Sequence, residues 1–225
     1  TKRGGKIFLT ARNGTVNNAG SVSTNSKNDI GGDVEITADE IVLLKEAKIS
    51  ATGEQGGGQI LVGGSWQNSD PGVYQATSTD VAEGAVINAS AIAKGDGGEV
   101  VVWSDIANKD STTKVNGTLY AKGGSQGGDG GKIETSGYKL DVEGIKVSTL
   151  ANNGSAGEWL LDPGTITIST DGAGSIPGGS GPGSATDISP STILTGLASN
   201  NVSIYTGING STEYDININD ICIIN

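Results

Sequence analysis

The sequence contains no histidine and no methionine, and only one cysteine, one phenylalanine and five prolines among its 225 residues. Without histidine it has no Ser-His-Asp or Cys-His nucleophile system and none of the common histidine-bearing zinc sites. The single cysteine, Cys222, cannot form a disulfide within the chain, and its apolar neighbours predict a buried small hydrophobic side chain. We therefore assign no catalytic, metal-binding or cofactor-binding residue and expect no enzymatic activity.

Long apolar runs are also missing. No stretch approaches the roughly 18 apolar residues that a membrane helix needs, and no basic start followed by an apolar run marks a signal peptide. The chain opens on TKRGGKIFLT, already inside a repeat, and stops on the apolar segment DININDICIIN. We expect it to be a segment of a longer protein.

Basic residues are scarce relative to acidic ones, with 14 against 25 and a net charge of -11. Nucleic acids and anionic membrane surfaces would repel such a chain, and no basic cluster offsets this. We expect no nucleic-acid partner and no membrane insertion. The acidic excess is typical of a solvated surface.

Glycine, by contrast, is abundant, with 38 residues, and its distribution reveals a repeat. The second glycines of successive Gly-Gly pairs, ending with an Ala-Gly variant, are spaced 27, 26, 40, 33 and 26 residues apart. Alternating apolar and polar residues follow each pair, the pattern of a strand with one buried face. The aligned glycines are Gly5, Gly32, Gly58, Gly98, Gly131 and Gly157. The predicted inward files are Ile7, Val34, Ile60, Val100, Ile133 and Trp159, then Leu9, Ile36, Val62, Val102, Thr135 and Leu161.

Two more strand-like segments complete each unit. A variable one, as in EIVLL and YKLDV, precedes a short one that predicts the inward file Val22, Ile49, Ile87, Leu119 and Val147. Three strands per unit without a helical period predict an all-β fold, a right-handed parallel β-helix with three strands per turn. Residues 1–225 would form a single solenoid segment. The Gly-Gly pairs are expected at corners, where positive φ and the close approach of successive turns exclude a β-carbon.

Two insertions interrupt the pattern. Residues 65–78 account for the 40-residue spacing and are expected to project as a loop, as are the Gly-, Pro- and Ser-rich residues 170–190. Beyond them, Ile193, Leu194 and Leu197 lie at helical spacing behind a Ser/Thr cap, which predicts one short helix near 190–198 lying on the shaft.

The tryptophans and acidic residues divide between the two faces. Trp159 belongs to an inward file, whereas Trp103 alternates outward, at a turn formed by the letters WSD. Trp66 and Tyr74 lie in the 65–78 loop and are the candidate partner-binding residues, unless they fold back to cover the shaft. The acidic residues expected to point outward, beside apolar neighbours, are Asp33, Glu35, Glu99, Glu134 and Glu158.

Several motifs in order resemble the repeat region of large exoproteins of the filamentous haemagglutinin type. They are GGGQILVGGSWQ, GGEVVVWSD, GGSQGGDGGKIETSG and GSAGEWLLDP, and the similarity covers most of residues 31–168. The chain is similar to high-molecular-weight adhesins and haem-haemopexin-binding exoproteins, which are exported by two-partner secretion. The resemblance implies a right-handed β-helical shaft, secreted or on the bacterial cell surface, and no binding site at any particular residue.

These observations lead to one functional expectation with two alternatives. The chain is expected to be a structural shaft of an adhesin that presents binding elements to host cells or neighbouring bacteria. Its partners would be a host receptor, glycan or carrier protein and, through a region outside this segment, an outer-membrane secretion transporter. The alternatives are a ligand-capture exoprotein that binds a haem carrier and a stalk that delivers a toxin to competing bacteria.

Overall fold

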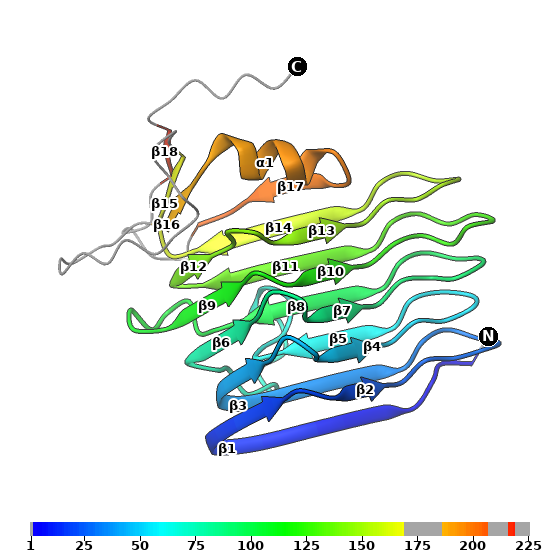
Figure 1. The fold of residues 1–225 in the computed structure, drawn as a ribbon, viewed down its shortest axis with the longest axis horizontal. Helices are drawn as coiled ribbons and strands as arrows, with labels where there is room; N and C mark the ends of the chain where they lie inside the picture. Colours follow the sequence, from blue (N-terminus) through cyan, green and yellow to red (C-terminus); the bar gives the residue numbers. More distant parts are fainter. Residues whose placement is uncertain (1, 169–185, 207–215, 219–225) are drawn as a thin grey trace.

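The computed structural model describes residues 2–168, 186–206 and 216–218 and has an all-β fold built from parallel sheets (Figure 1). The strands that form the main body are β1 (Lys6–Asn18), β2 (Ser21–Ser23), β3 (Asp33–Leu43), β4 (Lys48–Ser50), β5 (Gln59–Val62), β6 (Ser78–Val81), β7 (Val86–Asn88), β8 (Glu99–Trp103), β9 (Thr112–Val115), β10 (Thr118–Tyr120), β11 (Lys132–Gly137), β12 (Lys139–Asp141), β13 (Lys146–Ser148), β14 (Glu158–Pro163) and β17 (Asn201–Ile204). The remaining elements are β15 (Ile166–Ile168), β16 (Thr186–Ile188), β18 (Ile216–Ile218), the 3-10 helix η1 (Trp66–Asn68) and the helix α1 (Pro190–Leu197).

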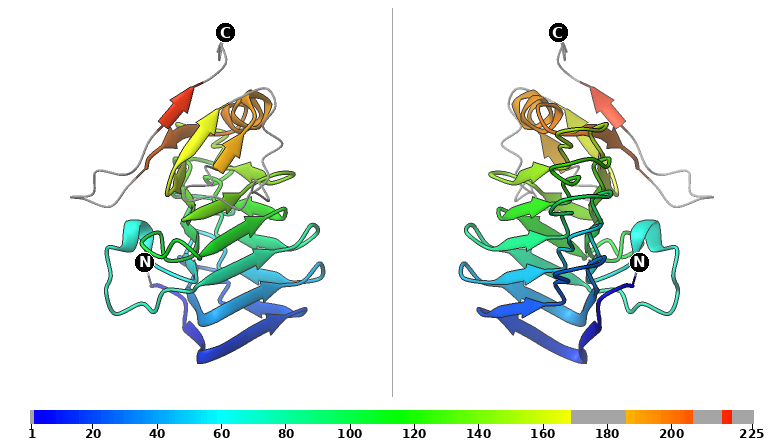
Figure 2. Two further views of the ribbon diagram at one scale, coloured as in Figure 1. Left: turned by 90° about the vertical axis from the view of Figure 1, so that its left-hand side faces the viewer. Right: turned by 90° about the vertical axis from the view of Figure 1, so that its right-hand side faces the viewer.

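Strands from successive repeats lie side by side and parallel. One row runs β1, β3, β5, β8, β11, β14, β17, and a second runs β2, β4, β7, β10, β13. A third row joins the second half of β3 to β6, β9 and β12. The repeats that begin with β3, β5, β8 and β11 therefore each contribute one segment to each of the three rows. Figure 2 shows the repeats stacked along the molecule.

The predicted inward files are confirmed by the register of the strands. In the first file Ile7 pairs with Val34, Val34 with Ile60, and Ile60 with Val100. The file continues through Ile133 to Trp159. The files beginning at Leu9 and Val22 are also in register throughout. Because each apolar side chain lies over an equivalent one, the buried core is a narrow column of aliphatic residues that runs the length of the stack.

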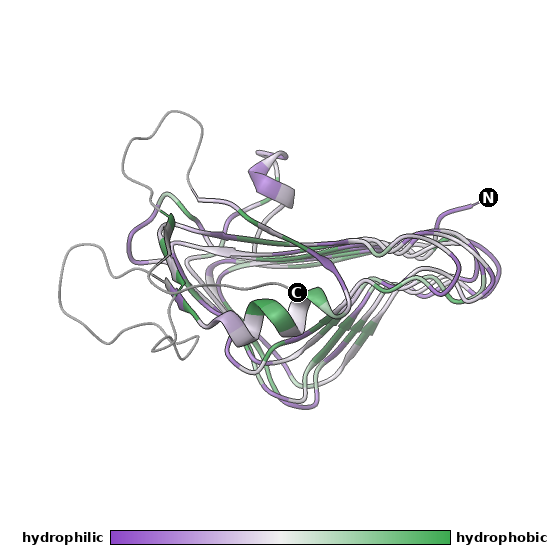
Figure 3. Ribbon diagram, turned by 90° about the horizontal axis from the view of Figure 1, so that it is seen from above, coloured by the Kyte–Doolittle hydropathy of each residue, from purple (hydrophilic) through white to green (hydrophobic). Residues whose placement is uncertain are grey.

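The Gly-Gly pairs lie where two walls of the stack meet backbone to backbone. The N–H of Gly98 donates to the carbonyl of Ala89 in the facing wall at 2.7 Å, and Gly131 repeats this contact with Ala121. A β-carbon on Gly98 would lie 1.9 Å from the carbonyl oxygen of Gly58 in the preceding repeat. Viewed along the stack, the walls converge into a narrow extension that ends in the connecting loops (Figure 3).

The predicted positive φ at these pairs is wrong. The described glycines with positive φ are Gly56, Gly63, Gly84, Gly95, Gly127, Gly128 and Gly144, and none of them belongs to an aligned pair. The requirement for glycine is therefore the close approach of neighbouring backbones, which leaves no room for a side chain.

The helix predicted near 190–198 is confirmed as α1. Ser189 is its N-cap, with its hydroxyl accepting from the backbone N–H of Thr192 at 3.2 Å, and Pro190 follows at the first helical position. Ile193 is buried and Leu197 packs against the main core, whereas Leu194 is exposed. Gly196 lies against the ring of Trp159, so α1 covers the C-terminal end of the apolar column before β17 resumes the sheet.

The predicted loop at 170–190 is wrong for residues 186–188, which form β16 in parallel with β15. Most of that loop, and Cys222, lie outside the described residues. Within the described part of the chain, no helix has the length and apolar character needed to cross a membrane.

Candidate functional site

The outer face of the long sheet, which points away from the core, carries a second apolar cluster and two buried carboxyl groups. In β8, β11 and β14 the outward residues alternate with the inward files, so Val101, Glu134 and Leu160 form one outward row. Trp103, Ser136 and Asp162 form the next row. The 65–78 insertion, which contains η1, folds over this face (Figure 2).

Beneath the insertion lies a second, smaller apolar cluster. It comprises Leu61, Val73, Val101, Trp103 and Ile106, with Trp66 packed against its margin. Trp103 points outward as predicted, but its predicted position in a turn is wrong: it ends β8 and its side chain is fully buried. The indole lies directly against Gly64, where a β-carbon would be 2.3 Å from the ring, and its N–H donates to the side chain of Gln75 at 3.1 Å.

The two candidate partner-binding residues are both half-buried in this insertion. The ammonium group of Lys132 lies 4.1 Å from the centre of the Trp66 ring, a cation–π contact. The hydroxyl of Tyr74 donates to the carboxylate of Asp39, and the guanidinium of Arg12 lies 5.4 Å from the ring centre. Both rings therefore contact the body of the fold, at opposite ends of the insertion, and they do not form one common surface.

Glu134 does not point into solvent as predicted. Its side chain is fully buried between the outward residues Val101 and Leu160. One carboxyl oxygen accepts from the backbone N–H of Gln67 at 2.8 Å and the other from the hydroxyl of Ser136 at 2.8 Å. Burial raises the pKa of Glu134 to about 8, despite these two donors. The side chain therefore carries its proton at neutral pH.

Asp162 is a second buried acidic residue on this face. It pairs across the sheet with Ser136, and one of its carboxyl oxygens is buried without a hydrogen-bond partner. Burial raises the pKa of Asp162 to about 7. Burial favours the protonated form, because the charged form would lose its hydration and one of its oxygens has no hydrogen bond to replace it.

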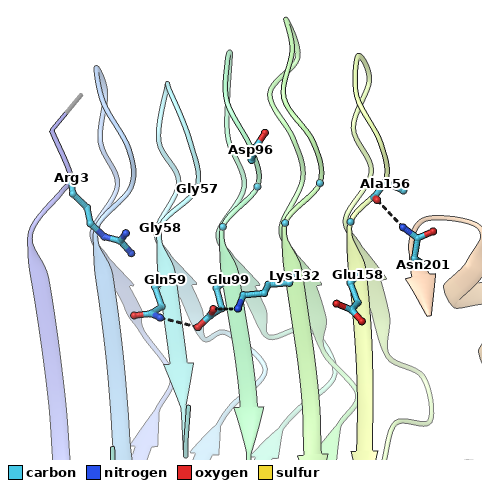
Figure 4. A pocket seen from close by; sticks show the side chains of 15 residues that line it. Arg3, Gly57, Gly58, Gln59, Asp96, Glu99, Lys132, Ala156, Glu158 and Asn201 are labelled. Atoms are coloured by element: carbon cyan, nitrogen blue, oxygen red, sulfur yellow. Dashed lines mark hydrogen bonds and ion pairs between the residues drawn. The ribbon is translucent and has the colours of Figure 1, made fainter. Parts of the chain in front are cut away.

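A polar groove of about 610 Å³ runs beside this face, over the Gly-Gly pairs (Figure 4). Glu99 accepts from the side-chain amide of Gln59 at 2.8 Å and forms an ion pair with Lys132 at 2.6 Å. Glu158 accepts from the hydroxyl of Ser203 at 2.6 Å. The groove is shallow and its acidic side chains already have partners within the fold.

The acidic side chains of the GGDGG region bond to backbone groups of neighbouring repeats. Among residues 2–168, 186–206 and 216–218, no three Cys, Asp or Glu side chains are placed to hold a metal ion. In the GGDGG motif, Asp129 accepts the backbone N–H of Ser155 at 2.8 Å, and Asp96 accepts that of Asp129 at 2.7 Å. These aspartates link successive repeats at the tips of the narrow extension.

No signal in the sequence singled out Glu134 or Asp162, because both alternate with apolar residues like ordinary exposed positions. The insertion at 65–78 was recognisable from the sequence, but the face of the sheet that it covers was not. A relevant hint was Val101 and Trp103 on the outward side of β8, since large apolar residues on both faces indicate a strand buried on both sides.

No model of a protein family matches the sequence, and no curated protein matches it.

Proposed function

We propose that the chain is a right-handed parallel β-helix with three strands per turn and that it serves as a shaft segment of a secreted, surface-associated bacterial exoprotein. It holds binding elements away from the cell, for contact with host cells or neighbouring bacteria. A secretion transporter would act on another region of the same protein. The chain itself contributes length and stiffness.

The continuous register of the three inward files is the observation that carries this proposal. A strand of one repeat donates and accepts hydrogen bonds with the equivalent strands above and below it, so bending the stack strains many bonds together. Each repeat adds about 4.8 Å of length. Such a stack can be lengthened by adding repeats without changing its cross-section, which suits a spacer.

Removal of one complete repeat tests the β-helix. Deleting residues 33–58 joins Gly32 to Gln59, and these residues take up the positions that Gly32 and Asp33 occupied, because Asp33 and Gln59 are register partners. We expect the shortened chain to fold with an unchanged strand content and a cooperative urea transition, measured by circular dichroism. Deleting residues 33–45 instead removes only part of a repeat and breaks the register, so that variant should lose the transition. Equal behaviour of the two deletions would contradict the proposed repeat unit.

The shaft function is tested on the cell that produces the protein. Antibodies against this chain should label intact, unpermeabilised bacteria, and beads coated with the isolated chain should adhere to host cells no better than beads coated with an unrelated acidic protein. A variant with residues 66–75 replaced by a short Gly-Ser linker serves as the matched comparison. Strong adhesion of the isolated chain that this replacement abolishes would favour ligand capture, and labelling only after permeabilisation would contradict surface exposure.

A further inference from the structure

The segment that covers the outer face, residues 65–78, is anchored to the fold at its base and through Tyr74 and Gln75, whereas residues 65–70 make few polar contacts with the sheet. At its base, the N–H of Ala76 donates to the carbonyl of Gly63 at 2.8 Å. Within residues 65–70, the backbone N–H of Gln67 donates to Glu134 on the sheet. The ring of Trp66 adds the contact with Lys132.

The backbone at this central contact is strained. Gln67 and Asn68 have φ values of 46° and 51°, in the left-handed region that non-glycine residues seldom adopt. Two adjacent residues in this region cost free energy that surrounding contacts must offset. If burial of Glu134 beneath the segment becomes costly, the strain favours release of the segment.

The closed segment favours the protonated form of Glu134, because it keeps water from the side chain and burial of the charge outweighs the hydrogen bond that Gln67 donates. Its neighbours Val101 and Leu160 are buried apolar side chains, which cannot solvate a carboxylate. The charged side chains that act on it are acidic, Asp162 on β14 and Glu99 on β8. In the covering segment, Asp70 lies near Glu35 of β3. Lys132, on the strand of Glu134, is the register partner of Glu99 and Glu158. Lys132 forms its ion pair with Glu99.

We propose that residues 65–70 form a proton-controlled latch, closed over the outer face while Glu134 is protonated and released when Glu134 loses its proton to water. Release lets water reach the carboxylate and removes the strain at Gln67 and Asn68. It also uncovers Trp66 and the edge of the apolar cluster around Trp103. The outer face then exposes an apolar surface that the closed form hides.

The sign of the pH dependence follows from proton linkage. A released Glu134 has an ordinary pKa near 4.5, whereas the closed form holds the pKa at about 8. The closed form therefore binds the proton more tightly. The stability that this proton gives the closed form is fully present below pH 4.5 and is lost as the pH rises to about 8. Within this window the opening equilibrium constant should rise about tenfold per pH unit.

Hydrogen exchange of the Gln67 amide measures the opening directly. After correction for the intrinsic exchange rate, we expect the opening constant of the wild-type chain to rise about 100-fold between pH 5 and pH 7. Glu134→Gln keeps an acceptor for the Gln67 N–H but cannot ionise, so its opening constant should change less than about threefold over the same range. Retention of the full pH response in Glu134→Gln would overturn the proposal.

Two controls separate the latch from other events. The amides of Ile60 and Val100, within the sheet, report opening of the whole stack. In the wild-type chain, a pH response of these two amides equal to that of the Gln67 amide would overturn a local latch. Asp162→Asn removes the other buried carboxyl group and should leave the response at Gln67 in place. Loss of the response in Asp162→Asn but not in Glu134→Gln would transfer the control to Asp162 and overturn the role of Glu134.

Discussion

Substituting Gly98 by alanine is expected to lower the free energy of unfolding by about 3 kcal/mol or more, a large effect for the addition of one methyl group. The new β-carbon would lie 1.9 Å from the carbonyl oxygen of Gly58 and 2.9 Å from that of Ala89. Both are backbone atoms within hydrogen-bonded ladders, so they cannot move aside as a flexible side chain would. Relief of the clash requires separation of two repeats, which breaks ladder bonds on both sides.

Gly5 provides a matched control for this substitution. It occupies the equivalent position of the first repeat, but a β-carbon there meets no atom within 4 Å, because β1 is an edge strand. Gly5→Ala should therefore change the unfolding free energy by no more than about 0.5 kcal/mol. Urea unfolding followed by circular dichroism compares the two variants. If both alanines are tolerated equally, close backbone approach is not the reason for the paired glycines.

The sequence predicts the inward files well because the signal is local and repeated. A strand alternates with a period of two, and the same alternation after each Gly-Gly pair aligns Ile7 with Val34 and Ile60 without knowledge of the fold. The helix α1 was also predictable, because Ser189 and Pro190 carry a local start signal. These elements are fixed by residues that lie near one another in the chain.

The environment of Glu134 could not be predicted in the same way. Its burial depends on an insertion that begins about 70 residues earlier in the sequence and donates the N–H of Gln67. Trp103 has the same explanation, because Gly64 and Gln75 of that insertion cover it. Alternation identifies which face a side chain points to, but it does not reveal whether a distant segment covers that face.

The apolar files make a second strong prediction, which concerns Ile60. Its side chain is fully buried, with Val34 on one side and Val100 on the other side of the same file. Ile60→Ala removes three carbon atoms from a column that backbone ladders hold at a fixed spacing, so the cavity cannot collapse. We expect a loss of about 3 to 4 kcal/mol in unfolding free energy, measured by urea titration.

Ile7 lies in the same file at the edge of the stack and separates stacking from simple hydrophobicity. Its side chain is half-buried and has a neighbour on one side, Val34. Ile7→Ala should cost roughly 1 kcal/mol, in proportion to the smaller apolar area that it buries. Because an edge strand can detach alone, hydrogen exchange of the Leu9 amide should accompany the urea titration, to separate fraying of β1 from unfolding of the whole stack. The proposed shaft rests on each side chain of the file being buried by neighbours on both sides. Equal losses of unfolding free energy at Ile7 and Ile60 would contradict this.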